Sequence, residues 1–476
     1  MLIVRHDNTK VLEVLRESKN ISFETKNTIA ETLCSIAKSF PNENLVWCYF
    51  KNYDNLNIKY LENLAIHKNH IRSFASKNYL KDAIGYIEIS PFININKNVV
   101  FPTWQMSGCV GVINTNVLNQ ISGNIVFDKD FSYFLNSLAK RMMPQGLFCY
   151  SDCNLLLDNS NIEGEIQLKN TFVFVKQHYK VVWLFLLFLN KIIYEKSFPI
   201  VSFIKAFFHK RRKPISFDSI EEESRTILHK TIDVLIPTIG RKEHLLNFLD
   251  CLKKQTLLPK RVIIIEQNPD ENSVSDFDFK ASDFPFEIVH FFTHKTGACN
   301  ARNIGLDNII SEYIFFADDD ILIENDFIEL AFQEMSKYPC NAFIFSCLNV
   351  GQAKQYNKVS QTTIFGSGCS IVKSEVVKNI RFDTQFEFGF GEDSDFGMQI
   401  RNKGEDVLYL PEPEIIHLKA PIGGFRTVSK KATTRKNKPS ETVILFKKKH
   451  DTTEQIRGFY TLYNVNKIIR KLKFKF

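Results

Sequence analysis

The chain has 476 residues, which is too many for one ordinary domain of roughly 100–200 residues, so two or three domains are expected. Its 44% hydrophobic residues are ample for buried cores, and 24% charged residues is ordinary for a soluble protein. The net charge of +8 is uneven, because the segment from Arg426 onward holds fifteen Lys or Arg and three Asp or Glu. The remainder is slightly acidic, so a basic catalytic surface for nucleic acid is not indicated.

Residues 1–178 are predicted to form a separate domain, and residues 179–228 a helical connector with a basic end at His209–Lys213. The N-terminus is charged at Arg5, too early for a signal peptide. The ten cysteines lack the spacing of a zinc site, so reduced thiols in a cytosolic protein are expected. The longest apolar run, Val181–Leu189, is far shorter than the about 20 residues of a membrane-spanning helix, and none is expected.

Residues 229–425 alternate strand and helix patterns. Four apolar runs rich in β-branched or aromatic residues predict buried strands at 232–236, 261–265, 286–290 and 313–317. Helical spacing of apolar residues marks 243–254, and 300–310 also has a helical pattern. This alternation predicts an α/β domain with a mostly parallel sheet, whose ligands bind at the carboxyl ends of the strands.

The two halves of the chain contain a faint internal repeat. Gly366–Val372 is followed by Val376-Val377, Arg381-Phe382-Asp383 and Gly404, while Met106–Val112 is followed by Val117-Leu118, Val126-Phe127-Asp128 and Gly146. Their similar order and spacing indicate a repeat on the scale of a domain, with coincidence as the alternative.

Three consecutive acids, Asp318, Asp319 and Asp320, directly follow the fourth predicted strand. With the period-two alternation of a strand, Asp318 and Asp320 point the same way and Asp319 the opposite way. Hard cations such as Mg²⁺ and Mn²⁺ bind carboxylate oxygens together with substrate phosphates. A solvated acidic turn is the alternative, but the position at a strand end favours a metal site.

A second acidic group, Glu392-Asp393 with Asp395, follows the glycines of Phe388–Gly391. Glycines allow backbone to approach a ligand closely. Phe396, Met398 and Ile400 indicate a helix whose first turn carries the acids, and such acids also occur simply to complement the helix dipole. A carboxylate here could act as a general base.

Taken together, these segments resemble the family-2 glycosyltransferases, which are inverting enzymes of the Rossmann-like GT-A fold that use nucleotide-diphosphate sugars. The resemblance rests on Ile236-Pro237-Thr238, Gly297–Gly305, Asp318–Asp320 and Gly391–Asp393, and it extends to His417. It implies a GT-A catalytic domain at 229–425, preceded by a second α/β domain. We interpret that first domain as a degenerate GT-A-like copy without a metal site, because Phe50-Lys51-Asn52 stands where the acid triplet is expected.

The resemblance also implies roles for individual residues. Asp393 would be the catalytic base, with Glu392 as its neighbour and rival. Asp318, Asp320 and His417 would bind Mn²⁺ or Mg²⁺. The residues expected to bind the nucleotide sugar are Pro237, Thr238, Arg241, Glu266, Arg302, Asp318 and Asp319. Glu266 stands where the family usually has Asp, which puts its contact with the nucleobase in doubt.

The sequence therefore predicts a metal-dependent inverting glycosyltransferase that acts in cell-surface polysaccharide or glycolipid assembly. The expected partners are a nucleotide-diphosphate sugar and a saccharide or lipid-linked saccharide acceptor, with no nucleic acid. A nucleotidyltransferase and a catalytically inactive nucleotide-sugar-binding scaffold are the rivals, although Pro237–Arg241 is a poor phosphate loop for the former.

The last segment, 426–476, is predicted to be a basic amphipathic tail. Its apolar residues recur at spacings of three and four, which places them on one helical stripe: Leu462, Val465, Ile469, Leu472 and Phe476. The stripe fits either an anionic membrane surface or a protein surface. We expect a cytoplasmic protein, and the membrane alternative would place it on the inner face of the cytoplasmic membrane.

Overall fold

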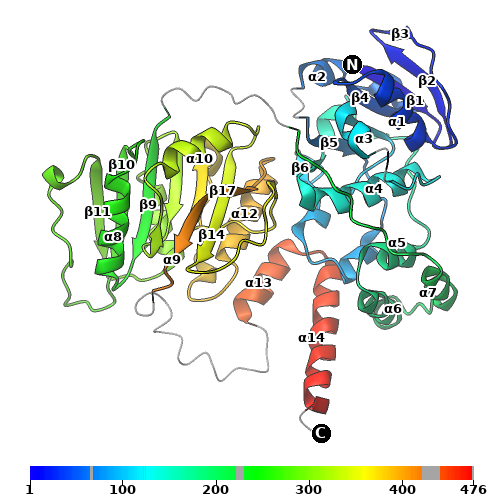
Figure 1. The fold of residues 1–476 in the computed structure, drawn as a ribbon. Helices are drawn as coiled ribbons and strands as arrows, with labels where there is room; N and C mark the ends of the chain where they lie inside the picture. Colours follow the sequence, from blue (N-terminus) through cyan, green and yellow to red (C-terminus); the bar gives the residue numbers. More distant parts are fainter. Residues whose placement is uncertain (65–67, 122, 124, 221–229, 421–439, 474–476) are drawn as a thin grey trace. The chain divides into compact units, whose positions relative to one another are not determined.

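A computed structural model describes residues 1–64, 68–121, 123, 125–220, 230–420 and 440–473 (Figure 1). The chain divides into two compact units, the first comprising residues 1–221 and 447–476 and the second residues 222–446. Each unit has one mixed β-sheet, so the expectation of two α/β domains is confirmed.

The second unit contains the predicted α/β alternation. Its sheet has the order β11-β10-β9-β12-β16-β14-β17-β13, with β15 pairing β17. Six strands run in one direction, as a mostly parallel sheet requires: β9 (Ile232–Thr238), β10 (Arg261–Gln267), β11 (Glu287–Thr293), β12 (Tyr313–Ala317), β14 (Ala342–Asn349) and β17 (Leu408–His417). The others run in the opposite direction: β13 (Ile321–Leu322), β15 (Ser360–Gln361) and β16 (Cys369–Lys373).

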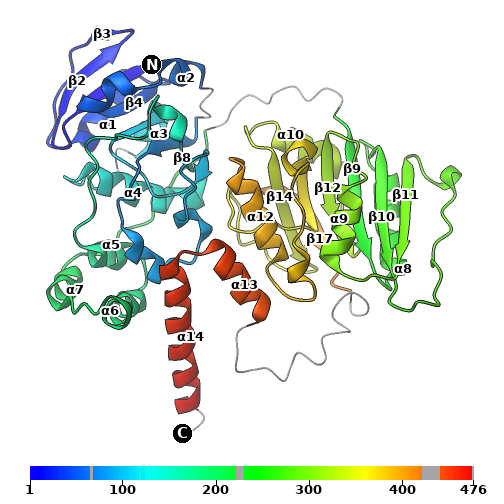
Figure 2. The same ribbon diagram turned by 180° about the vertical axis from the view of Figure 1, so that it is seen from behind.

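Helices cover both faces of this sheet, and two neighbouring phenylalanines of β12 show why. Successive strand residues face opposite sides. Phe315 contacts Phe248 of α8 (Lys242–Lys253) and Phe327 of α10 (Phe327–Met335). Phe316 contacts Phe396 of α12 (Glu392–Asn402), on the side that also carries α9 (Ala298–Leu306). Figures 1 and 2 show these two helix pairs in front of the sheet from opposite sides.

The remaining helices of the second unit are short or terminal. They are α11 (Ser374–Val377) and the beginning of α13 (Glu441–His450). Leu445 and Phe446 of α13 pack against the core beneath α12.

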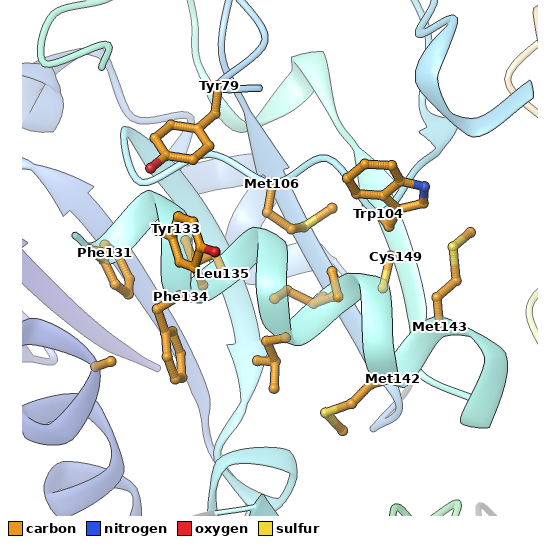
Figure 3. Close-up of a cluster of buried hydrophobic side chains, with 14 of the residues drawn as sticks. Tyr79, Trp104, Met106, Phe131, Tyr133, Phe134, Leu135, Met142, Met143 and Cys149 are labelled. Carbon is orange, nitrogen blue, oxygen red and sulfur yellow. The ribbon is translucent and has the colours of Figure 1, made fainter. Parts of the chain in front are cut away.

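The first unit has a sheet of order β3-β2-β1-β4-β7-β5-β8-β6. Its strands are β1 (Leu2–His6), β2 (Val11–Arg16), β3 (Lys19–Asn20), β4 (Asn44–Tyr49), β5 (His70–Phe74), β6 (Phe101–Pro102), β7 (Val110–Asn114) and β8 (Phe148–Ser151). Its helices are α1 (Ile29–Ser39), α2 (Ile58–Asn63), α3 (Thr115–Ile121), α4 (Phe131–Met142), α5 (Thr171–His178), α6 (Val181–Glu195), α7 (Ile200–Phe207) and α14 (Thr453–Lys473). Figure 3 shows side chains of α4 meeting Trp104, Met106 and Cys149 in the core.

The two sheets share an order of strands. The run β1-β4-β7-β5-β8 has the same sequence of parallel and antiparallel pairings as β9-β12-β16-β14-β17. The chain visits these five strands in the same order in both units, whereas the sixth strand, β6 or β13, comes from a different place. The motifs of the predicted repeat, Met106–Val112 and Gly366–Val372, enter the matching strands β7 and β16, which agrees with a repeat.

The pairing register also aligns the acid triplet with the first unit. Ala317 of β12 pairs with Cys369, so Asp318 comes next opposite Gly368. In the first unit Cys48 pairs with Val110, and Tyr49 donates its backbone N–H to Cys109. Continuing this register puts Phe50, Lys51 and Asn52 at the places of the three aspartates.

The C-terminal residues 447–476, predicted as part of a tail, group with the first unit. Leu462 and Val465 of the expected stripe pack against the first unit's core, whereas Ile469 is exposed. Leu472 and Phe476 lie outside the described side chains. Among the described residues, no helix has the length and apolar character needed to cross a membrane.

Candidate active site

The candidate site lies along one edge of the second unit's sheet. The parallel strands β9, β10, β12 and β17 end at this edge with Thr238, Gln267, Ala317 and His417. Strand β16 runs in the opposite direction, so its first residues, after Gly368, lie at the same edge. The topology therefore collects side chains from distant segments at the place where ligands bind in open α/β sheets.

Asp318, Asp320 and His417 form a group with metal-ligand chemistry, with one potential ligand atom of each within 4.8 Å of the others. The register explains the contact, because Ile321 of β13 pairs with His417 and so places Asp320 beside it. His417 Nε2 lies 3.2 Å from Asp320 Oδ1, and the Ala420 N–H donates to Asp320 Oδ2 at 2.9 Å.

The charge state of Asp320 follows from these contacts. Burial alone would raise its pKa, but the hydrogen bonds from His417 and Ala420, with the charge of Arg241, outweigh it and lower the pKa to about 2. The hydrogen bond with Asp320 raises the pKa of His417. Asp320 is therefore ionised over the physiological range, as a cation ligand must be.

Asp319 lies outside this group and binds Arg241. The Thr238 hydroxyl donates to Asp319 Oδ2 at 2.7 Å, and Arg241 Nη1 donates to Oδ1 at 2.8 Å. Arg241 also lies 3.3 Å from Asp320 Oδ2. Burial raises the pKa of Asp319 to about 6, although Arg241 opposes the shift. These contacts connect Thr238, Arg241 and Asp319 at the edge, and their contact with a nucleotide sugar stays a prediction.

Asp318 is the most open of the three aspartates, with a side chain 38% exposed. Arg302 of α9 lies 3.3 Å from its Oδ1. Its carboxylate packs directly on Gly368, where an added Cβ would lie 2.2 Å from Oδ2. The absence of a side chain at residue 368 therefore leaves the space that the Asp318 carboxylate fills.

The second acidic group lies in the first turn of α12, directly after Gly391. The φ of Gly391, +111°, suits glycine and turns the chain into the helix. Asp393 accepts a hydrogen bond from the Ser367 hydroxyl. Burial raises the pKa of the Asp393 carboxyl to about 6, with Arg302 opposing the shift and Glu392 adding to it. Glu392 is partly exposed, whereas Asp395 is fully buried and accepts from Gln399 at 2.8 Å.

The predicted nucleobase residues lie farther along the edge. Glu266 is buried, and its carboxylate accepts from the Asp276 N–H at 2.8 Å and lies 2.9 Å from His290 Nε2. It therefore anchors the loop after β10. Pro237 is partly exposed at the end of β9. Their contact with a nucleobase stays a prediction.

Ser367 and Gly368 were not predicted as site residues, although they connect both acidic groups: Ser367 contacts Asp393, and Gly368 contacts Asp318. The available signal was the Gly366-Ser367-Gly368 motif, which indicated only a repeat. Glu387 was also missed; it accepts the Asn300 N–H at 2.6 Å at the start of α9.

Comparisons with known proteins find similarity to glycosyltransferases. The family model described as glycosyl transferase family 2 matches residues 233–395. The glycosyltransferase GlyA of Streptococcus pneumoniae is 20% identical over 206 residues, 38% of this chain and 29% of GlyA. An uncharacterized glycosyltransferase of Rickettsia felis is 31% identical over 126 residues, 26% of this chain and 20% of that protein. The chain thus spans less than a third of these two relatives.

Among solved structures, S. aureus TarS 1–349 in complex with UDP-GlcNAc is similar at 16% identity with a TM-score of 0.33, covering 41% of this chain and 60% of TarS 1–349. GalNAc-T7 with UDP, GalNAc and Mn²⁺ is 12% identical with a TM-score of 0.33, covering 48% of this chain and 56% of that protein.

Proposed function

We propose, from the premise that residues 233–395 form a glycosyl transferase family 2 domain, that the second unit moves a sugar from a nucleotide-diphosphate sugar to an acceptor hydroxyl group. The observation that carries the proposal is the grouping of Asp318, Asp320 and His417 at the ligand-binding edge, with Asp393 joined to it through Ser367 and Gly368. This arrangement offers separate groups for the two chemical problems of the reaction.

The first problem is the negative charge of the departing diphosphate. Two carboxylates and an imidazole suit Mn²⁺ and, less well, Mg²⁺, so Asp318, Asp320 and His417 would hold the cation. Bound there, Mn²⁺ or Mg²⁺ would neutralise leaving-group charge. Arg302, which pairs with the partly exposed Asp318, would contact the nucleotide.

The second problem is the proton of the acceptor hydroxyl. In an inverting transfer, the acceptor oxygen bonds to the anomeric carbon as the bond from that carbon to the diphosphate oxygen breaks. We assign Asp393 as the base that takes the acceptor's proton. A pKa near 6 leaves Asp393 ionised at neutral pH, yet closer to the operating pH than an ordinary aspartate. Glu392 is the rival for this role.

For the donor, we propose that Pro237 and Glu266 flank the nucleobase, with Arg241 and Asp319 shaping the floor of the site. The Glu266 carboxylate accepts the Asp276 N–H and lies beside His290, so it would act by holding the loop after β10 against the nucleobase. We propose that the acceptor is a saccharide or lipid-linked saccharide in cell-surface polysaccharide or glycolipid assembly.

For the first unit, we propose a role in acceptor placement, assembly or stability, without sugar-transfer chemistry. Phe50, Lys51 and Asn52 hold the places of the metal-binding aspartates, and Asn52 is bonded through its side chain to the backbone of Glu163. For the tail, packing of Leu462 and Val465 on this unit supports the protein-surface alternative, while the exposed Ile468 and Ile469 leave the end of α14 available to a membrane.

A panel assay tests the proposal against its rivals. The full-length protein is incubated with several nucleotide-diphosphate sugars and Mn²⁺, and the released phosphates are identified. Release of a nucleoside diphosphate is expected for one donor. Pyrophosphate formation from a nucleoside triphosphate and a sugar phosphate would identify a nucleotidyltransferase instead. Donor binding without any release, in the presence of saccharide acceptors, would identify an inactive scaffold.

A further inference from the structure

The outer sides of α6 and α7 in the first unit expose an unusual number of apolar side chains. Ten of the exposed large hydrophobic residues among those described lie between Val181 and Phe208. The six most exposed of these define what we call the α6–α7 face: Val182, Phe185, Phe198, Val201, Ile204 and Phe208. Phe208 is 83% exposed and Phe198 67%. Isolated exposed apolar residues are ordinary, but a contiguous group marks an interaction surface.

The α6–α7 face is continuous across the two helices. Val182 and Phe185 of α6 are three residues apart, and Val201, Ile204 and Phe208 at α7 are three and four apart, as on one helical side, while Leu184, Leu187 and Ala206 are buried. Phe185 of α6 and Phe207 of α7 join the helices, with ring centroids 6.1 Å apart, although both remain exposed. Figures 1 and 2 show α6 and α7 side by side next to α5.

The charge around this face is strongly positive. Residues 171–217 contain nine Lys or Arg and one acid, Glu195, which pairs with Lys191 at 2.7 Å. Lys180, Lys205, Lys210 and Arg211 are exposed, and none of them forms an ion pair with a carboxylate in the described part of the chain. A protein partner that matched only the apolar face would leave these four basic side chains without acidic partners.

We propose that the α6–α7 face seats the protein on an anionic lipid bilayer. Apolar side chains ringed by lysine and arginine suit the boundary between acyl chains and acidic headgroups. Helix α6 has 15 residues, too short to span a bilayer that needs about 20, so both helices lie along the surface. The inference does not rest on the proposed glycosyl transfer, and it assigns the main contact to α6 and α7 and not to α14.

Flotation of the full-length protein tests this surface. Vesicles contain phosphatidylcholine alone or equal amounts of phosphatidylcholine and phosphatidylglycerol. We expect strong binding to the anionic vesicles at low salt, weakening as salt rises. The triple variant V182E/V201E/F208E should bind about tenfold or more weakly, because it removes apolar contact and adds charge of the wrong sign. Each of K205Q, K210Q and R211Q should cost about fivefold.

The matched control is I89E/V126E/L157E, which changes equally exposed apolar residues elsewhere in the first unit. It should float like the wild type, and all variants should keep the wild-type melting temperature and nucleotide release in solution. The proposal is overturned if the wild type ignores anionic vesicles at low salt, or if the triple variant floats unchanged. It is also overturned if the triple variant converts an oligomer to a monomer without changing flotation, since the face would then be a protein interface.

Discussion

His417 Nε2 lies 3.2 Å from Asp320 Oδ1, although 97 residues separate them in the chain. The contact exists because β13, which follows Asp320 directly, pairs with the end of β17. One short strand thus brings an imidazole to the third carboxylate of the acid triplet. The pair, with the more open Asp318, is the basis of the metal proposal.

Removal of the cation is expected to abolish transfer. A chelator should stop nucleoside diphosphate release, and Mn²⁺ should restore it. Asp320→Asn should prevent the restoration, because it removes a buried anionic ligand while keeping nearly the same shape. The control is Asp326→Asn, an exposed residue shortly after the triplet, which is the N-cap of α10 but makes no side-chain capping hydrogen bond. Full activity in chelator would contradict the metal proposal.

Activity should fall as the pH drops through about 6. The base works only when ionised, and Asp393 gains its proton as pH falls through a pKa of about 6. A cation beside Asp318 would lower the pKa of Asp393 and so move this acidic limb of the pH–rate profile to a slightly lower pH. Asp393→Asn should lower kcat by roughly 10²–10⁴ with donor binding kept. An active Asp393→Asn variant together with an inactive Glu392→Gln variant would reverse the assignment.

Ser367→Ala gives a finer check of the same base. Its hydroxyl bonds to Asp393 and lowers the pKa of that carboxyl. Loss of the bond should move the acidic limb of kcat upward by roughly 0.4–1 pH unit, the equivalent of one hydrogen bond. A uniform loss of rate without a shifted limb would show that Ser367 only supports the local fold.

Gly368→Ala should damage the metal site more than the fold. The new Cβ would lie 2.2 Å from Asp318 Oδ2, so the carboxylate has to move. We expect weaker Mn²⁺ binding in calorimetry and a raised Mn²⁺ requirement for turnover. Gly123→Ala, with nothing within 4 Å of its added Cβ, is the control for glycine replacement. Unchanged Mn²⁺ affinity in Gly368→Ala would contradict the role of Asp318.

Asp233 is expected to matter for stability and not for chemistry. This fully buried carboxylate accepts from Arg261 at 3.2 Å, from the Ile310 N–H at 2.9 Å and from the Ser311 hydroxyl at 2.6 Å. Asp233→Ala leaves the buried Arg261 guanidinium without a carboxylate, with the Asn308 carbonyl oxygen still accepting from it, and should lower the free energy of unfolding by about 3–5 kcal/mol. Denaturant unfolding of the wild type and the variant measures this free energy. A change below about 1 kcal/mol would show that Arg261 becomes hydrated in the variant.

Much of the second unit could be predicted, because its strands are continuous apolar runs. Arg261–Gln267 is buried along its whole length, and Leu245, Leu249 and Leu252 of the predicted helix are buried in α8. Asp318–Asp320 was found because it interrupts such a run. The connector was predicted to be helical from its apolar run, and α6 and α7 lie within it, although residues up to 221 group with the first unit.

The rest depends on contacts between distant segments. Arg241 pairs with Asp319 and Asp320, and Ser367 with Asp393, but local periodicity carries no information about partners 26–79 residues away. The amphipathic stripe of α14 was ambiguous for the same reason, since a hydrophobic stripe does not specify what covers it. Only the packing of Leu462 and Val465 on the first unit gives their environment.

The most direct test is a crystal structure with Mn²⁺ and the nucleoside diphosphate of the best donor bound. Anomalous scattering would locate the manganese. We expect one strong peak in contact with Asp318, Asp320, His417 and the diphosphate, with Asp393 facing the open side of the nucleotide. A bound nucleotide with no manganese peak at these three residues would contradict it.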